Sequence, residues 1–285
     1  MRPTPFQRRR MPRLDILSLA VLPLGVVVIL LAHYLDGSRI GALLQGSSAL
    51  VVFGGTLAAI LISYSPSEIA KAVRAAAGAY QHHDDDLDVL AATMVTLSIR
   101  GHRRGLPALE PEIDDLTDPF LREGLGLIID GTEEATVRDL LTMEKEAREL
   151  EDEAPARIFE AAAGYAPTMG ILGAVLGLMR VMEHLSAPGT LGGGIALAFV
   201  ATVYGVGSAN LVFLPIAGRL RERAAVQARR RELMLHGLMA MQQRLNPRLV
   251  AHKLRAFSSR VPRIDELTAA MPSRAPQVRA PRIPA

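Results

Sequence analysis

Four apolar segments, each about as long as a membrane is thick, limit the folds open to this sequence more than any other feature. A helix needs about 20 mostly apolar residues to cross the hydrocarbon layer, where its backbone polar groups must be hydrogen-bonded internally. The segments cover residues 14–34, 43–64, 161–182 and 191–217, and short loops join them in two pairs. The sequence therefore predicts an all-α, polytopic membrane protein with four transmembrane helices in two hairpins.

The composition agrees with a membrane protein whose helices pack closely. Hydrophobic residues make up 49% of the chain but aromatic residues only 4%, so Ala, Leu, Val, Ile and Gly supply the apolar mass. Small residues of this kind let membrane helices approach each other. The chain has no cysteine, which excludes disulfides, iron–sulfur clusters and thiol catalysis.

The distribution of arginine predicts the orientation in the membrane. Arginine-rich stretches precede the first segment, in residues 1–13, and follow the fourth, in residues 219–231. The two loops inside the hairpins are poor in Lys and Arg. Since basic residues favour the cytoplasmic side, both termini and the long central region are expected in the cytoplasm, and the protein is expected in the lipid of the inner (plasma) membrane.

This topology divides the chain into six regions. In order, they are a basic cytoplasmic N-terminus (1–13), a first transmembrane hairpin (14–64), a large helical cytoplasmic region (65–160), a second transmembrane hairpin (161–217), cytoplasmic helices (218–257), and a tail rich in Pro and Arg that is expected to be disordered (258–285).

Capping and amphipathic signals predict the helices outside the membrane. In the large cytoplasmic region they are expected over residues 66–80, 87–100, 118–130 and 132–153. A further charged helix is expected over residues 219–244, and Asn246-Pro247 should end it. The acidic stretch from His82 to Asp86 is interpreted as a solvated linker, because no second cluster at metal-ligand spacing accompanies it.

Ionisable residues are missing from the middle of all four apolar segments. Arg180 lies near the outer end of the third, where its side chain is expected to reach the interface. An ion carrier needs an ionisable group at membrane depth. If ions cross the membrane here, a partner protein must supply the carboxylate.

The third and fourth segments carry more than a plain membrane anchor needs. Pro167 interrupts the hydrogen bonding of the third, where Gly173 and Gly177 form a face that allows another helix to approach closely. The fourth contains Thr202 and Pro215 among other polar and small residues. Any one of these residues is explained by helix packing alone, but the whole set favours a polar-lined face against a partner.

These residues resemble the A-type stator subunit of the bacterial flagellar motor, the MotA/PomA family. The resemblance covers residues 14–253. The matching motifs are Gly164 to Gly170 and Gly173 to Leu178 in the third segment, Ala198 to Gly205 with Pro215 in the fourth, and Arg103-Arg104-Gly105, Ala108-Leu109-Glu110, Asp130-Gly131 and Asn246-Pro247-Arg248 outside the membrane.

The resemblance implies an ion-driven machine with two kinds of subunit. Family members form a pentameric ring around two copies of a B-type (MotB/PomB-like) partner, whose aspartate takes up the ion. Pro167 and Pro215 match prolines that couple ion binding to movement, and Thr202 matches a polar residue near the ion path. Sodium-driven members tend to have threonine where this chain has Ala174. Because alanine offers no oxygen ligand to sodium, protons are the expected ion.

The resemblance also implies a contact with the rotor. Glu110 matches a carboxylate that meets FliG, the switch-complex protein of the rotor. The matching basic position holds His102, which is only partly charged near neutral pH, and the neighbouring Arg103 and Arg104 could supply the charge. Without the resemblance, these residues would be interpreted as a solvated charged surface.

Two other functions compete with a stator. A TolQ/ExbB-like subunit that energises the outer membrane has similar paired helices but only one span before its cytoplasmic region. A membrane scaffold would need no ion flow. An enzyme is the weakest interpretation, because no phosphate loop, nucleophile elbow or metal-binding helix motif is present. No cofactor and no nucleic-acid partner are expected.

Overall fold

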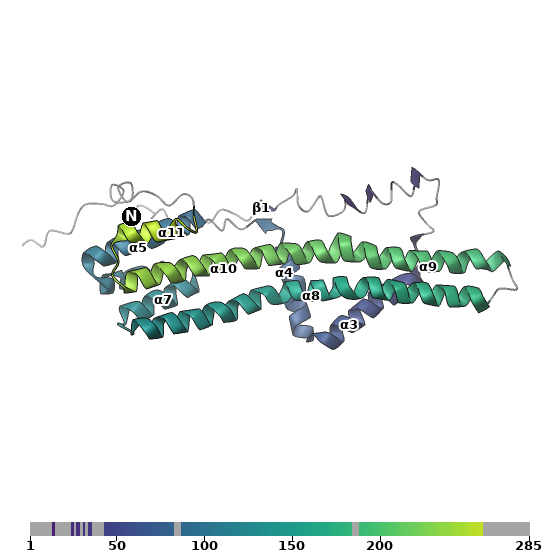
Figure 1. Cartoon of the computed structure of the whole chain (residues 1–285), viewed down its shortest axis with the longest axis horizontal. Coiled ribbons are helices and arrows are strands. Elements are labelled where there is room, and N and C mark those ends of the chain that lie inside the picture. The colour runs from purple at the N-terminus through teal and green to yellow at the C-terminus, as the bar shows by residue number, and fades with distance from the viewer. Residues whose placement is uncertain are drawn as a thin grey trace, which may run out of the picture. The chain divides into compact units, whose positions relative to one another are not determined.

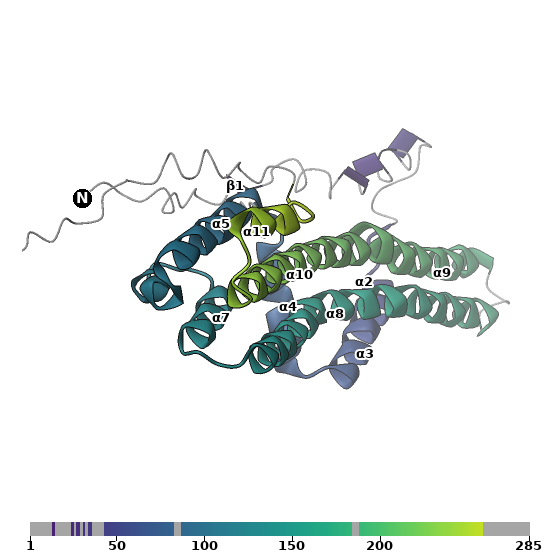
Figure 2. The same ribbon diagram turned by 60° about the vertical axis from the view of Figure 1, so that its left-hand side comes forward.

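The computed structural model describes residues 13–14, 24–25, 27–28, 31, 34–35, 43–82, 87–183 and 188–258. The fold is helical, with long helices that run through most of the described chain (Figure 1 and Figure 2). It divides into two compact units. The first unit comprises residues 1–84 and 147–226, and the second comprises residues 85–146 and 227–285.

Three of the four predicted spans appear as helices long and apolar enough to cross a membrane. One runs over Gly46–Ser63, and the other two lie within Glu134–Glu183 and Leu191–Gln242. The remaining span, predicted over residues 14–34, lies mostly outside the described residues. The helical class and three spans are thus confirmed, and the first span stays a prediction.

The helix over Gly46–Ser63 consists of α2 (Gly46–Ala49), the π-helical turn η2 (Leu50–Gly54) and α3 (Gly55–Ser63). Its buried residues recur every fourth position, at Ser48, Val52, Thr56 and Ile60. This spacing places all four on one face, because residues i and i+4 lie above one another on a helix. The other faces expose leucine and isoleucine side chains, as a lipid-facing helix does.

The third span belongs to a much longer helix than its apolar segment. Helix α8 (Glu134–Glu183) runs for 50 residues and continues through Pro155 and Pro167. The sequence predicted a charged helix over 132–153 and a separate span over 161–182, but the structure joins them. A change from charged to apolar side chains does not break a helix, because the backbone hydrogen bonds do not depend on it.

The fourth span is likewise continuous with the charged helix that follows it. Helix α9 (Pro188–Ser208) leads through the π-helical turn η4 (Ala209–Phe213) into α10 (Leu214–Gln242). Pro215 follows two residues after this turn. Its ring conflicts with the carbonyl four residues earlier, on Leu211, which lies inside η4. The wider turn is where the helix departs from regular α geometry.

Helix α4 (Pro66–Gly78) follows the second span directly and begins with a complete cap. The Ser65 side chain accepts a hydrogen bond from the Glu68 backbone N–H, and the Glu68 carboxylate accepts one from the Ser65 backbone N–H. This capping box satisfies two backbone donors that a helix start leaves free. Together with Pro66 at the first turn, it confirms the helix predicted from Pro66 onward.

The second unit is a helical bundle with its own core. It contains α5 (Leu87–Arg104), the 3₁₀ turn η3 (Leu106–Leu109), α6 (Glu110–Ile113), α7 (Pro119–Ile129), α11 (Pro247–Leu254), the start of α8 and the end of α10. Asp118 caps α7, as the sequence predicted, and Asn246, which was predicted to end the preceding helix, also caps α11. The fully buried residues include Met94, Leu109, Phe120, Leu125, Leu141, Leu233, Leu238 and Leu254.

Two short strands are the only β structure among the residues described. Strand β1 (Arg13–Leu14) pairs antiparallel with β2 (Gln81–His82) in the first unit. Leu14 was predicted as the first residue of the first span, and His82 as part of a linker. The rest of that linker, residues 83–86, lies outside the described residues.

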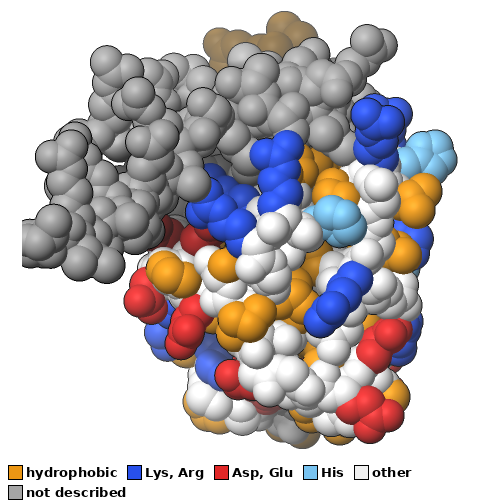
Figure 3. Space-filling view, turned by 90° about the vertical axis from the view of Figure 1, so that its left-hand side faces the viewer, with side chains coloured by type: hydrophobic (Ala, Val, Ile, Leu, Met, Phe, Trp, Pro, Cys, Tyr) orange, Lys and Arg blue, Asp and Glu red, His pale blue; other side chains and the backbone are white. Residues whose placement is uncertain are grey.

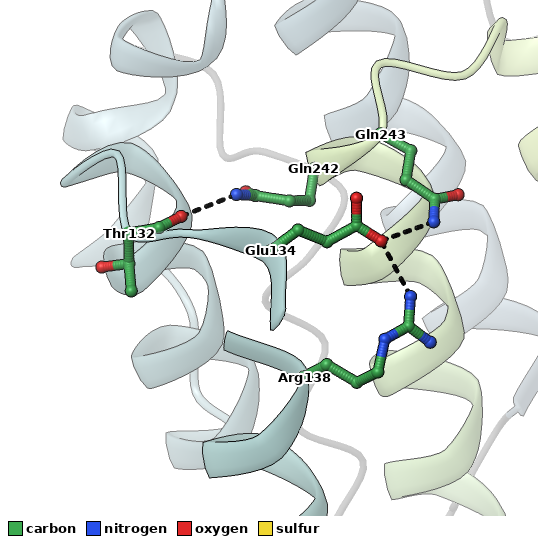
Figure 4. A network of polar contacts seen from close by, with 5 residues as sticks. All are labelled: Thr132, Glu134, Arg138, Gln242 and Gln243. Atoms are coloured by element: carbon green, nitrogen blue, oxygen red, sulfur yellow. Dashed lines mark hydrogen bonds and ion pairs between the residues drawn. The ribbon is translucent and has the colours of Figure 1, made fainter. Parts of the chain in front are cut away.

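Polar side chains fix the start of α8 to the end of α10 within the second unit. Gln242 donates to the Thr132 carbonyl over 2.8 Å, and Gln243 donates to the Glu134 carboxylate over 2.6 Å (Figure 4). Arg138 Nη2 lies 2.8 Å from the same carboxylate oxygen. The hydrogen bond from Gln243, and then the one from Arg138, lower the pKa of Glu134.

A second polar contact joins the same two helices. Lys145 on α8 forms an ion pair with Glu232 on α10, and His236 Nε2 lies 3.0 Å from the other Glu232 oxygen. The hydrogen bond from Lys145 is the main reason that the pKa of Glu232 is lowered, and its attraction to Lys145 and His236 adds to the effect.

Replacing Glu232 should weaken the protein only where this carboxylate is ionised. A lowered folded-state pKa stabilises at pH values above the unfolded pKa, near 4.3, and the contribution disappears as pH falls through the folded value. We therefore expect Glu232→Gln to lower the thermal midpoint of the purified chain by about 1–4 °C at pH 7, and by progressively less as the pH falls below the unfolded pKa.

The matched control is Glu146→Gln, because Glu146 is an exposed carboxylate one residue from Lys145. It should leave the midpoint unchanged across the same pH range. A loss for Glu232→Gln that stays the same from pH 7 down to the lowest pH at which the chain remains folded would contradict the electrostatic explanation.

Candidate functional site

Helices α8 and α9 lie side by side in the first unit, with their backbones in contact (Figure 1 and Figure 2). A methyl group added to Gly205 would come within 2.5 Å of the Ala166 carbonyl oxygen and 3.0 Å of Gly170 Cα. One added to Gly177 would lie 2.9 Å from the Ala198 nitrogen. Only glycine fits at such positions, so the separation of the two helices depends on these residues.

The glycine face predicted in the third span is used within the chain. Gly173 lies against Ala201 of α9 and Val51 of the second-span helix, and Gly177 lies against Ala198. The expected close approach of another helix is confirmed. That helix is the chain's own α9, however, so these two glycines face a neighbouring span of the same chain, whereas the sequence favoured a partner.

The second-span helix is held against α9 by a hydroxyl group that sequence reasoning missed. Ser48 is buried, and its Oγ donates to the Leu197 carbonyl over 3.1 Å. Thr56, two turns further on, is 4% exposed, and its hydroxyl has no hydrogen-bond partner within the described parts of the chain. The signal available in the sequence was the spacing of four between Ser48, Val52, Thr56 and Ile60.

Tyr204 joins α9 to the residues just before the second-span helix. Its hydroxyl donates to the Leu43 carbonyl and accepts a hydrogen bond from the Gln45 backbone N–H over 3.3 Å. Its ring centroid lies 5.7 Å from that of Phe53. The polar group of the tyrosine is therefore satisfied inside an apolar region, which explains its presence at membrane depth.

Three of the residues predicted for the ion path lie around the α8–α9 contact. Thr202 is half-buried beside Gly170, and its hydroxyl donates to the Ala198 carbonyl over 3.3 Å. Ala174 is half-buried one turn beyond Gly170, and Pro167 lies seven residues before Ala174. Since residues seven apart share a side of a helix, Pro167 and Ala174 lie along one edge of α8.

Pro215 lies outside this group. It is exposed near the start of α10, after the π-helical turn. The position of Pro215 therefore relates to the helix geometry at the π-helical turn. It does not relate to a contact with Thr202 or Ala174.

The chemistry that these residues can perform is limited. The Thr202 hydroxyl gives its proton to Ala198, so its oxygen can still accept a hydrogen bond. No carboxylate, histidine or lysine accompanies it in the middle of the four apolar segments. Among the described residues, no group of three His, Asp or Glu side chains is placed to hold a metal ion. The arrangement can orient and desolvate a charged group that another chain brings, but it cannot itself carry a proton.

The residues predicted to meet the rotor lie around one tight turn in the second unit. His102, Arg103 and Arg104 end α5 and are exposed. Gly105 then adopts a φ of 86°, which favours glycine, and the chain folds back as η3. A methyl group on Gly101 would lie 3.3 Å from both Leu106 and Leu109, so the turn packs tightly against α5.

Leu109 anchors this turn while its neighbour faces solvent. Leu109 is fully buried, and Glu110 directly after it is exposed. An ion pair of 2.6 Å between Arg100 on α5 and Glu112 on α6 holds the two sides of the turn together. Sequence reasoning missed this pair, although the opposite charges on either side of Gly105 were a signal. Basic and acidic side chains are interspersed at this end of the second unit (Figure 3).

Comparisons with known proteins agree with this geometry. Residues 112–233 match the model of the MotA/TolQ/ExbB proton channel family. The chain is 35% identical to YtxD, an uncharacterized protein of Bacillus subtilis, over 88% of this chain and 93% of that protein. It is 31% identical to motility protein A of the same organism, over 85% of this chain and 90% of that protein.

A solved structure is similar along nearly its whole length. A chain of the flagellar MotAB stator complex from Bacillus subtilis superposes with a TM-score of 0.74 and 31% sequence identity, and the match covers 89% of this chain and 99% of that one. The arrangement of helices described above is therefore that of a chain found in a stator complex.

Enlarging Gly205 should destabilise the α8–α9 contact. The added methyl group would overlap the Ala166 carbonyl, and overpacking of this kind costs about 1–3 kcal/mol. We expect Gly205→Ala to lower the thermal midpoint of the purified protein in detergent. The matched control is Gly207→Ala on the same helix, where no atom lies within 4 Å of the added group. Equal midpoints for the two variants would show that the helices do not touch at Gly205.

Proposed function

Because this chain belongs to the MotA/PomA family, within the MotA/TolQ/ExbB proton channel family, we propose that it is the A-type stator subunit of a bacterial flagellar motor. The observation that carries this function is its likeness to a MotAB stator chain, which covers 99% of that chain. The protein works in a membrane, in an oligomeric complex with a B-type partner. We assign no enzymatic reaction to it.

In the assembly that we propose, five copies surround two copies of the B-type partner. The lack of ionisable groups in the middle of the apolar segments supports a division of labour in which the partner carries the ion on an aspartate. The α8–α9 surface around Thr202 would face that carboxylate. The Thr202 hydroxyl oxygen can accept a hydrogen bond from the protonated carboxyl group, while the apolar neighbours of Thr202 exclude water.

Pro167 would make the ring responsive to the state of that carboxylate. A proline has no N–H, so the carbonyl of Ala163, four residues earlier, loses its usual donor within α8. A helix bends most readily where such a bond is missing. A small shift near Thr202 could thus tilt the adjoining part of α8. Pro215, next to the π-helical turn, would have the same effect on α10.

We propose that the coupling ion is a proton. Sodium must replace its water shell with oxygen ligands, and the half-buried Ala174 on α8 offers none from its side chain. Thr202 alone would leave such a site poorly coordinated, whereas proton transfer to a carboxylate needs no such set of oxygen atoms.

The exposed turn of the second unit would contact the rotor. We propose that Glu110, together with Arg103, Arg104 and His102, meets the switch-complex protein FliG. The anchoring of Leu109 and the Arg100–Glu112 pair support this role, because they hold the exposed charges on a rigid turn. A rigid turn can transmit force to the rotor without deforming first.

The proposed topology has four transmembrane helices in the inner membrane and both termini in the cytoplasm. The distribution of arginine and the three described spans support it. A TolQ/ExbB-like role is less well supported, because the similarity to motility protein A extends over 90% of that protein. The experiments below distinguish the proposed stator from a membrane scaffold without ion flow.

Reversing the charge at Glu110 should reduce torque without affecting assembly. We expect Glu110→Lys to lower swimming speed severalfold in cells that rely on this stator, while the amount of complex in the membrane stays the same. The matched control is Asp139→Lys, which reverses another exposed acidic residue of the second unit. Normal swimming with Glu110→Lys would contradict the rotor contact.

Removing the Thr202 hydroxyl should separate an ion path from a scaffold. Thr202→Val keeps the shape of the side chain but removes its acceptor, so we expect the B-type partner to co-purify at the normal level while motility falls. Thr56→Val is the matched control, because the buried Thr56 hydroxyl makes no hydrogen bond within the described chain. Unchanged motility with Thr202→Val would favour the scaffold, and loss of the partner would favour a packing role.

A further inference from the structure

Helix α4 lies where three spans of the first unit end. One buried cluster joins Ala72 of α4 to Ile60 of the second-span helix and to Ile158 and Ala162 of α8. A second joins Ala79, just after α4, to Ala156 of α8 and Leu220 of α10. Both clusters contain residues that lie at or beside the boundary of an apolar segment.

This placement fixes the depth of α4 relative to the membrane. The second-span helix ends at Ser63, two residues before Ser65 caps α4. On α8, the apolar segment begins near Ala161, within the cluster that holds α4. The charged part of α10 begins at Arg219, next to Leu220 of the second cluster. All three boundaries mark the level of the lipid headgroups, so α4 lies at that level.

The opposite face of α4 is exposed and carries two positive charges. Lys71 and Arg74 are exposed and three residues apart, which places them on one side of the helix. Val73 is 58% exposed, but at about 100° per residue it lies on another side of α4 from Lys71. A helix with basic residues on its exposed face is typical of segments that lie in a membrane interface.

Neither cation is neutralised within the described residues. The Nε of Arg74 donates to the Ala70 carbonyl over 3.3 Å, which leaves its terminal nitrogens free to bind another group. The only acidic residue of α4, Glu68, is engaged by Ser65, whose Oγ lies 2.7 Å from the carboxylate. Lys71 attracts this carboxylate but forms no ion pair with it.

A third cation adds to the positive potential near the end of α4. Arg223 of α10 donates from Nη1 to the Gly78 carbonyl over 2.5 Å. This bond uses one of the carbonyls that a helix end leaves free, and it brings a guanidinium group to the negative end of the helix dipole. The surface of α4 is therefore positive from its middle to its C-terminal end.

We propose that Lys71 and Arg74 form a binding site for the headgroups of anionic phospholipids. Lys71 would attract the headgroup charge as a compact cation, and the free nitrogens of Arg74 would bind its phosphate oxygens. The aliphatic stems of both residues would contact the outermost part of the acyl chains. This site goes beyond the stator function, because it concerns the lipid around the protein and neither the ion nor the rotor.

Lipid fits this surface better than an acidic protein segment does. Because α4 lies at the ends of the spans, its neighbour must be charged at the level of the headgroups and apolar just below them. A phospholipid has this arrangement, and the charged ends and aliphatic stems of the exposed Lys71 and Arg74 match it. If this surface instead contacted a second copy of the chain, assembly of the complex would depend on Lys71 and Arg74. The experiment tests this dependence directly.

The experiment compares lipid association in the assembled complex. The complex is placed in phosphatidylcholine vesicles that contain a small amount of spin-labelled lipid, either phosphatidylglycerol or phosphatidylcholine. The fraction of label immobilised by the protein gives the preference for the anionic lipid. A basic residue near an anionic surface contributes about fivefold in affinity, so we expect K71Q/R74Q to reduce the preference at least fivefold.

Two further variants make the result specific. R244Q/R248Q removes two exposed arginines of the second unit and should leave the preference unchanged. K71R/R74K exchanges the two side chains but keeps both charges, and it should retain most of the preference. Since the readout is lipid association, it does not depend on whether the complex drives a motor.

Two outcomes would overturn the proposal. An unchanged preference for phosphatidylglycerol in K71Q/R74Q would show that the lipids contact other residues. Loss of the assembled complex in K71Q/R74Q, with assembly retained in K71R/R74K, would show that the two charges bind a second copy of the chain. The proposal predicts that all four proteins assemble and that only K71Q/R74Q loses the preference.

Discussion

The backbone contact between α8 and α9 determines how the rest of the first unit is arranged. At Gly205, Gly170 and Gly177 the two helices touch without side chains between them. Membrane helices gain little from burying apolar surface against each other, because lipid is equally apolar, so close packing and hydrogen bonds must supply the attraction. The Ser48 hydroxyl then attaches the second-span helix to the same surface. Thr202 and Ala174 owe their positions to this contact.

Local features of the fold could be predicted from the sequence with good accuracy. The apolar segments identified three described spans, and the sequence predicted helix starts at Pro66 and after Asp118 that the structure contains. Each of these signals acts within a few residues, because a cap satisfies backbone groups of the adjacent turn. Where the cause of a structure is local, the sequence displays it directly.

The contacts between distant segments could not be predicted in the same way. The glycines of α8 indicated close approach of a helix, but nothing in their spacing distinguished a partner from the chain's own α9. The Arg100–Glu112 pair and the Ser48–Leu197 bond depend on turns and helix positions that only the folded chain defines. For the candidate site, the sequence identified residues but left open which of them lie together.

The π-helical turn η4 also sets the angular register between two parts of one helix. The buried positions that begin in α9 end at Ala209, the first residue of η4, and those of α10 resume at Ala217, eight residues later. In a regular α-helix, residues eight apart lie about 80° out of line. A wider turn winds the chain less per residue, so it brings Ala217 back toward the side on which Ala209 lies. The wider turn therefore keeps the buried side of α10 in line with the buried side that ends at Ala209. A one-residue insertion or deletion between residues 209 and 213 would rotate every later side chain of α10 by about 100° and lose this alignment.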